Sequence, residues 1–208
     1  MLRYEPITIF YLAPDMRTFL PGLLLTALTI TPVRAQQSLP KSDTRVLFSF
    51  DSVDEARWGI VNDGVMGGRS QGFGEISEGH VRFWGELVTR GGGFTSVRTQ
   101  ASLNLSAFDG VELRVRGGGR TFEVEISDGH RFRGRTVSRR AAFKTDGNWT
   151  TVRIPFSALK SSIFGQPVQT PPLDPSRVRG IGLYILDGID GPFELEVDEI
   201  RVYRDVRT

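Results

Sequence analysis

Apolar and polar residues alternate along most of the chain beyond residue 45, and this alternation is its clearest regularity. The alternating apolar positions are Val46, Phe48 and Phe50; Val81 and Phe83; Val111, Leu113 and Val115; Phe122, Val124 and Ile126; Val152 and Ile154; and Ile181, Leu183 and Ile185. A period of two residues is typical of β-strands that bury one face. The pattern therefore predicts many short strands, each with one apolar face.

Turn signals separate these segments. Dipeptides such as Asp109-Gly110 and Asp187-Gly188 fall between them, and no window carries a sustained apolar stripe with helical spacing. Short strands joined by such turns predict an all-β fold, a two-sheet jelly-roll β-sandwich. Near the end of the chain the apolar parity changes between Val197 and Ile200, which predicts a β-bulge at residues 198–199.

Glycine is concentrated in one part of the chain. The sequence has 24 glycines, and 11 of them fall between Gly59 and Gly93. Because glycine permits positive φ and close approach of another backbone or a ligand, this clustering predicts two tightly folded loops, at residues 62–70 and 91–96.

Several motifs lie in order along residues 46–203. They are Trp58; Asn62-Asp63-Gly64-Val65-Met66-Gly67-Gly68-x-Ser70; Phe83-x-Gly85-x-Leu87; Gly92-Gly93-Phe94; Trp149-x-x-Val152-x-Ile154-Pro155-Phe156; and Phe193-x-Leu195-x-Val197. This ordered set resembles the complex I intermediate-associated protein 30 family. The resemblance implies a galactose-binding-like domain without catalysis. Mitochondrial members of that family assist the assembly of respiratory complex I, whereas the same sandwich elsewhere often binds carbohydrate.

The two glycine-rich loops are the first candidate binding site. Their candidate residues are Asn62, Asp63, Met66, Gly67, Gly68, Ser70, Gly92, Gly93 and Phe94. Backbone N–H groups, a carboxylate, an amide and a hydroxyl within a few positions could hold a sugar, a peptide or an anion. Alternatively, Asn62 and Asp63 satisfy the amides of the loops themselves, as such residues commonly do in turns. Met66 would then plug the loop or offer a flexible apolar contact.

Two further groups are candidates for ligand contact. Arg131, Arg133 and Arg135 occupy alternate positions, so a strand here would present three guanidinium groups on one face to an acidic ligand. The alternative is a solvated face that pairs with acidic neighbours. Trp84 points away from the predicted buried face of its strand and could stack on a sugar ring, with core packing as the alternative.

The sequence offers little material for catalysis or metal binding. It has two histidines, no cysteine and no G-x-S-x-G motif, which leaves little for a thiolate zinc site or a nucleophile triad. Asp51 and Asp198 could meet at a sheet edge and bind calcium, with simple solvation as the alternative. We expect no catalytic residue, no bound metal and no cofactor.

Residues 1–35 are predicted to export the chain. Met16-Arg17 gives a short basic start, residues 19–30 are mostly apolar, and Val33 and Ala35 suit a cleavage site. We expect translation from Met16, cleavage after Ala35, and a periplasmic or secreted product without a transmembrane span. Residues 36–44 would form a linker and residues 45–205 the folded domain.

These expectations combine into one functional prediction. The domain carries nearly balanced charge, which argues against nucleic acid as a partner. We predict a non-catalytic binding module that acts as an assembly or folding factor for a protein complex, with an assembly intermediate as its partner. The alternative is a carbohydrate-binding protein of the envelope, with a glycan as its ligand.

Overall fold

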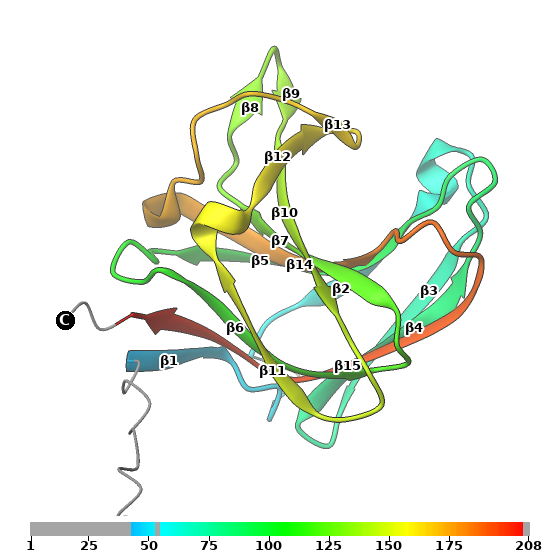
Figure 1. Cartoon of the computed structure of the whole chain (residues 1–208), viewed down its shortest axis with the longest axis horizontal. Helices are drawn as coiled ribbons and strands as arrows, with labels where there is room; N and C mark the ends of the chain where they lie inside the picture. Colours follow the sequence, from blue (N-terminus) through cyan, green and yellow to red (C-terminus); the bar gives the residue numbers. More distant parts are fainter. Residues whose placement is uncertain (1–42, 53–54, 206–208) are drawn as a thin grey trace, which may run out of the picture. The chain divides into compact units, whose positions relative to one another are not determined.

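The computed structural model describes residues 43–52 and 55–205, which form two β-sheets that pack against each other (Figure 1). The first sheet has the strand order β11-β6-β15-β4-β3, and β1 pairs with β15. Its strands are β1 (Asp43–Phe48), β3 (Gln71–Ser77), β4 (His80–Leu87), β6 (Gly110–Gly117), β11 (Thr150–Pro155) and β15 (Gly191–Arg204).

The second sheet has the strand order β13-β12-β10-β7-β14-β5-β2. Its strands are β2 (Trp58–Asn62), β5 (Thr95–Leu103), β7 (Thr121–Ser127), β10 (Ser138–Lys144), β12 (Lys160–Ile163), β13 (Gln166–Pro167) and β14 (Val178–Ile185). The main strand pairs of both sheets are antiparallel.

Short elements complete the described part of the chain. They are the hairpin β8 (Arg131–Phe132) and β9 (Arg135–Thr136), and the 3-10 turns η1 (Asp63–Met66), η2 (Phe156–Ala158) and η3 (Pro175–Arg177). The predicted all-β sandwich is therefore confirmed.

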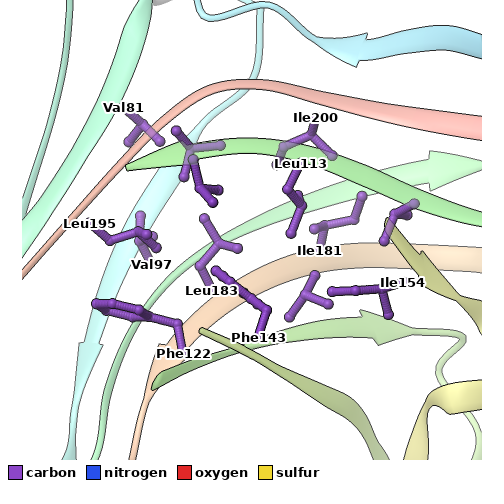
Figure 2. Packing of buried hydrophobic residues seen from close by; sticks show 14 of the residues in the cluster. Val81, Val97, Leu113, Phe122, Phe143, Ile154, Ile181, Leu183, Leu195 and Ile200 are labelled. Atoms are coloured by element: carbon purple, nitrogen blue, oxygen red, sulfur yellow. The ribbon is translucent and has the colours of Figure 1, made fainter. Parts of the chain in front are cut away.

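The core lies between the two sheets, where their apolar faces meet. Val81, Leu113 and Leu195 come from the first sheet, and Val97 and Leu183 from the second (Figure 2). Each is at most 2% exposed. These residues are the apolar members of alternating segments, so the period-two pattern of the sequence follows from burial of one face of each strand.

The bulge predicted near the end of the chain is confirmed. The pairing of β15 with β6 shifts register between Val197 and Glu199. Val197 and Ile200 are both fully buried, although they lie three positions apart. The extra residue returns the strand to the correct parity, and it lets the long strand β15 bury apolar side chains on both sides of the bulge.

One ion pair is buried beside the core. Arg139 Nε donates to Asp128 Oδ2 at 3.0 Å, and its Nη1 donates to the Pro171 carbonyl at 2.8 Å. The Asp128 carboxylate also accepts the backbone N–H groups of His130 and Asp174. Burial raises the pKa of Asp128, but these hydrogen bonds and Arg139 outweigh burial and hold the pKa below its usual value.

The structure gives one result on membrane crossing. Among the residues that it describes, no helix combines the length and the apolar character needed to span a bilayer.

The buried pair leads to a stability prediction. Arg139→Met should lower the free energy of unfolding by about 3 kcal/mol or more, because Asp128 would stay buried without its counter-ion. Arg177→Met is the matched control, since Arg177 pairs with Asp174 at an exposed site and such pairs contribute about 1 kcal/mol at most. Urea denaturation measures both variants, and equal losses would contradict a structural role for the buried pair.

Candidate functional site

Three loops meet at one end of the sandwich, and we call this region the loop end (Figure 1). The first contains η1 and joins β2 to β3, the second joins β4 to β5, and the third joins β14 to β15. The Asp63 N–H donates to the Phe94 carbonyl at 3.2 Å, which ties the first loop to the second. The Thr89 N–H donates to Asp190 Oδ1 at 2.6 Å, which ties the second loop to the third.

Asp63 opens η1, and it is 0% exposed. Its Oδ1 accepts the Ser70 N–H at 2.9 Å. Its Oδ2 accepts the Ser70 hydroxyl and the Gly93 N–H, each at 2.7 Å, and the Phe94 N–H at 3.3 Å. One carboxylate therefore satisfies three backbone N–H groups and one hydroxyl, which come from both glycine-rich loops.

Two glycines leave the space that this carboxylate occupies. A Cβ atom at Gly68 would lie 2.1 Å from Asp63 Cγ, and one at Gly92 would lie 2.4 Å from Asp63 Oδ2. Both separations are far below van der Waals contact. Glycine is thus required at both positions for the loops to enclose the Asp63 side chain.

Asn62 and Ser70 extend the same network. Asn62 Oδ1 accepts the Gly72 N–H at 2.9 Å and the Thr95 hydroxyl at 2.6 Å. Ser70 Oγ accepts the Val88 N–H at 3.1 Å. The side chains of Asn62 and Asp63 satisfy donors of the loops and of adjoining strands, as the second interpretation of the sequence proposed.

The network sets the charge state of Asp63. Burial raises the pKa of Asp63, but the hydrogen bonds from Gly93, Ser70 and Phe94 favour the ionised form and together hold the pKa below its usual value. The carboxylate is therefore ionised at neutral pH, as an acceptor of four hydrogen bonds must be.

Two of the polar residues expected to touch a ligand are buried at the loop end, and other residues are exposed there. Asp63 and Ser70 are buried, so these side chains cannot contact a ligand directly in this structure, and they hold the loops instead. Met66, at 60% exposure, is no plug and points to solvent. Gly67 is exposed at the end of η1, and Phe94 is half-buried.

A second charged group, which the sequence did not reveal, holds the third loop. Arg120 forms a two-pronged pair with Asp187, with both N···O distances at 2.7 Å, and it donates to the carbonyls of Ile189 and Pro192. Hydrogen bonding to Arg120 lowers the pKa of Asp187. The Ile189 side chain is 58% exposed. In the sequence, the signal for an exposed contact at Ile189 was an apolar residue between two Asp-Gly turns.

Trp84 lies on the outer face of β4, half-buried. Its ring stacks on Phe73 with centroids 6.0 Å apart and planes 29° apart. The Arg82 guanidinium lies 4.6 Å from the centroid of the same ring. Because Phe73 is 51% exposed, the two rings form an exposed aromatic pair at the edge of the first sheet.

The predicted strand with three arginines on one face is wrong. The chain reverses at Arg133 and Gly134, where φ is +51° and +78°. The two-residue strands β8 and β9 pair on either side of this turn and form a hairpin. Glycine at position 134 accepts the positive φ that such a turn requires. Arg131, Arg133 and Arg135 are all exposed, around the hairpin tip and not along one strand face.

The candidate calcium ligands have other surroundings. Asp198 forms an ion pair with Arg114, and Asp51 is exposed. Among the described residues, no group of three or more acidic, histidine or cysteine side chains is placed to hold a metal ion.

Comparison with known families identifies the family of the chain. Residues 48–197 match the family described as Complex I intermediate-associated protein 30 (CIA30). The chain belongs to the CIA30 family. A CIA30 relative from Mus musculus, "Complex I intermediate-associated protein 30, mitochondrial", is 30% identical over 197 residues, covering 83% of this chain and 60% of the mouse protein. The chain thus spans less than two thirds of the length of that relative.

Solved structures share the CIA30 sandwich. The family 11 carbohydrate-binding module of the cellulase Lic26A-Cel5E of Clostridium thermocellum has a TM-score of 0.56 at 17% identity, covering 77% of this chain and 94% of the module. The same family in complex with a β-1,3-1,4-mixed-linked tetrasaccharide has a TM-score of 0.56 at 16% identity, covering 79% and 98%. At these identities the likeness shows the fold alone.

The CIA30 comparison corrects the predicted location. The mouse relative is mitochondrial, which contradicts the expectation of a periplasmic or secreted product, and that prediction is wrong. An apolar segment with a short basic start does not by itself define a destination. The start at Met16, the cleavage after Ala35 and the linker at residues 36–44 fall almost entirely on residues outside the described part of the chain.

The carboxylate network leads to a prediction for this CIA30 domain. Asp63→Asn should lower the free energy of unfolding at pH 7 by about 2 kcal/mol, because an amide replaces one acceptor oxygen by a donor among buried N–H groups. The folded-state pKa of Asp63 is lowered, so its stabilisation is present above the unfolded value of about 3.9 and disappears as pH falls through the folded value. Denaturation curves across this pH range measure the difference between the two proteins.

Asp146→Asn is the matched control, because Asp146 is exposed and its Oδ1 accepts a local backbone N–H, from Asn148. We expect it to change the free energy of unfolding by no more than about 0.5 kcal/mol. Equal stability of Asp63→Asn and the natural protein, at every pH, would contradict the role of the carboxylate.

Proposed function

We propose that this chain is a non-catalytic binding module that associates with an incompletely assembled protein complex through its loop end. The observation that carries the proposal is a pair of exposed apolar side chains, Met66 and Ile189, on loops whose backbones are fixed by internal charged groups. Membership of the CIA30 family supports an assembly intermediate of respiratory complex I as the partner.

Fixed loops suit this task for an energetic reason. A surface that orders itself only on binding loses about 0.5–1.5 kcal/mol for each side chain that becomes immobile, and loop ordering adds to that loss. At the loop end, Asp63 and Arg120 have already ordered the backbones that carry Met66 and Ile189. The cost of ordering the loops is therefore not subtracted from the binding energy of these two side chains.

The chemistry of the two side chains also fits a partner that is incompletely assembled. Subunits awaiting assembly expose apolar surface that the finished complex covers. Met66 has an unbranched, polarisable side chain that adapts to irregular apolar surfaces. Ile189 adds a stiff aliphatic contact on the neighbouring loop. Such a surface supports reversible binding, as an assembly factor requires.

A second candidate function is glycan binding, and the aromatic pair of Phe73 and Trp84 favours it. Exposed aromatic rings side by side can stack on sugar rings. The related fold of the carbohydrate-binding modules adds an analogy of architecture only. Against this candidate, Arg82 lies over the Trp84 ring and competes with a sugar for it.

The leading proposal predicts the effect of removing both apolar side chains. Met66→Ser with Ile189→Ser should reduce recovery of complex I intermediates from solubilised membranes by at least about tenfold, because each buried aliphatic side chain contributes about 1.5 kcal/mol or more. Quantitative pull-down with the full chain, followed by immunodetection of complex I subunits, measures this recovery. Val46→Ser, at an exposed apolar residue of β1, is the control and should recover the natural amount. Equal recovery by the double variant and the natural chain would reject the proposal.

The second candidate makes a separate prediction. If the aromatic pair binds glycan, soluble β-1,3-1,4-mixed-linked glucan in a native gel should retard the full chain, and Trp84→Ala should migrate freely. Trp149→Ala serves as control, because Trp149 packs against Arg114, Arg116 and His80 on another part of the first sheet. Migration of the natural chain unaffected by the glucan would contradict glycan binding at this site.

A further inference from the structure

Two hairpins, β8–β9 and β12–β13 (Figure 1), follow strand ends of the second sheet that lie away from the loop end. Ser127, at the end of β7, pairs with Gly180 of β14, whereas Ile185, where the third loop begins, pairs with Phe122.

One hairpin tip is the turn of Arg133 and Gly134 between β8 and β9, and the other is the turn of Phe164 and Gly165 between β12 and β13. The Arg135 guanidinium lies 5.1 Å from the centroid of the Phe164 ring. This contact brings the tips side by side, and we call them the paired tips.

The paired tips and the short strands beside them carry three positively charged side chains. Arg131, Arg133 and Arg135 are exposed, and among residues 43–52 and 55–205 none of them has an ion-pair partner. The Arg131 guanidinium donates to the Gly134 carbonyl, and the Arg133 guanidinium lies 5.3 Å from the centroid of the Phe132 ring. By contrast, the arginines on the outer face of the first sheet pair with glutamates and aspartates of neighbouring strands.

The paired tips also expose a large aromatic side chain. Phe164 is 69% exposed, the highest value among the large apolar residues that the structure describes as exposed. It occupies a position with φ of +49°, and Arg133 occupies the equivalent position with φ of +51°. Turns of this kind favour Asn, Asp or Gly there. Formation of the turns thus does not explain why the sequence has Phe and Arg at the tips.

We propose that the paired tips dock on a membrane surface that carries anionic phospholipid. The guanidinium groups would hydrogen-bond lipid phosphates in the two-pronged manner that arginine favours. The Phe164 ring would enter the headgroup region, where an apolar ring beside a cation is well accommodated. This docking would leave the loop end, at the other end of the second sheet, free to reach a membrane-bound partner.

The shape and charge of the tips favour a lipid surface over other occupants. Stable protein interfaces bury about 800 Å² on each partner with close complementarity, whereas two turns of two residues each project as points. A nucleic acid partner is usually matched by a strong basic excess, whereas the whole chain has a formal net charge of only +2. A fluid anionic surface needs neither an extended complementary face nor a basic groove.

Flotation of the full chain with vesicles tests this proposal. One set of vesicles contains phosphatidylcholine alone, and the other contains phosphatidylcholine mixed with phosphatidylglycerol. We expect binding to the mixed vesicles only, with affinity that falls as salt is added. Arg133→Asn with Arg135→Ser should weaken binding about fivefold for each arginine removed. Phe164→Asn should weaken it as well, and Asn suits the backbone of that turn, so loss of folding would not account for the result.

Arg69→Asn with Arg90→Asn is the matched control, because both residues are exposed arginines of the loop end and the same charge is removed. This variant should bind the mixed vesicles like the natural chain. The proposal is overturned if neutral vesicles bind equally well, or if the tip and loop end variants lose the same affinity. It is also overturned if the natural chain binds soluble polyglutamate or single-stranded nucleic acid and no vesicles. None of these outcomes depends on partner binding by Met66 and Ile189.

Discussion

The carboxylate of Asp63 is the acceptor that organises the loop end. Four donors converge on it from Ser70, Gly93 and Phe94. A loop rich in glycine loses much conformational entropy when it becomes ordered, so two such loops need a compensating interaction. A buried, ionised acceptor supplies it, because hydrogen bonds to a charged group are stronger than neutral ones. Glycine at positions 68 and 92 leaves the space that the Asp63 carboxylate occupies.

The third loop is held in the same way, but by a group of the opposite charge. Arg120 is a cation that collects acceptors, the Asp187 carboxylate and loop carbonyls, whereas Asp63 is an anion that collects donors. Each group fixes a backbone and leaves one apolar side chain, Ile189 or Met66, in solvent. An exposed apolar side chain on an ordered backbone can bind a partner without the cost of ordering the loop. The polar residues Asp63 and Arg120 thus shape the loops that we propose contact the partner, while the proposed contacts are apolar.

The sequence predicted the architecture well because each strand buries one face and so repeats every two residues. Even the parity change between Val197 and Ile200 corresponded to a real bulge. The sequence predicted the placement of single side chains less well. Alternation cannot distinguish a strand from a tight hairpin, as at Arg133. Ile189 was missed because one apolar residue in a turn has no periodicity. Asp63 was identified as important, but whether a carboxylate faces a ligand or its own loop depends on contacts between residues some 30 positions apart.

Native-state hydrogen exchange measured by NMR tests the central claim most directly, because it reports whether the loops are fixed before any partner binds. If the Asp63 carboxylate holds them, the amides of Ser70 and Gly93 will exchange slowly, within the range of the core strands. The amide of Gly64, in the same turn but on its exposed side, will exchange much faster. If Ser70 and Gly93 exchange as fast as Gly64, the carboxylate does not order the loops, and the account given for the loop end is wrong.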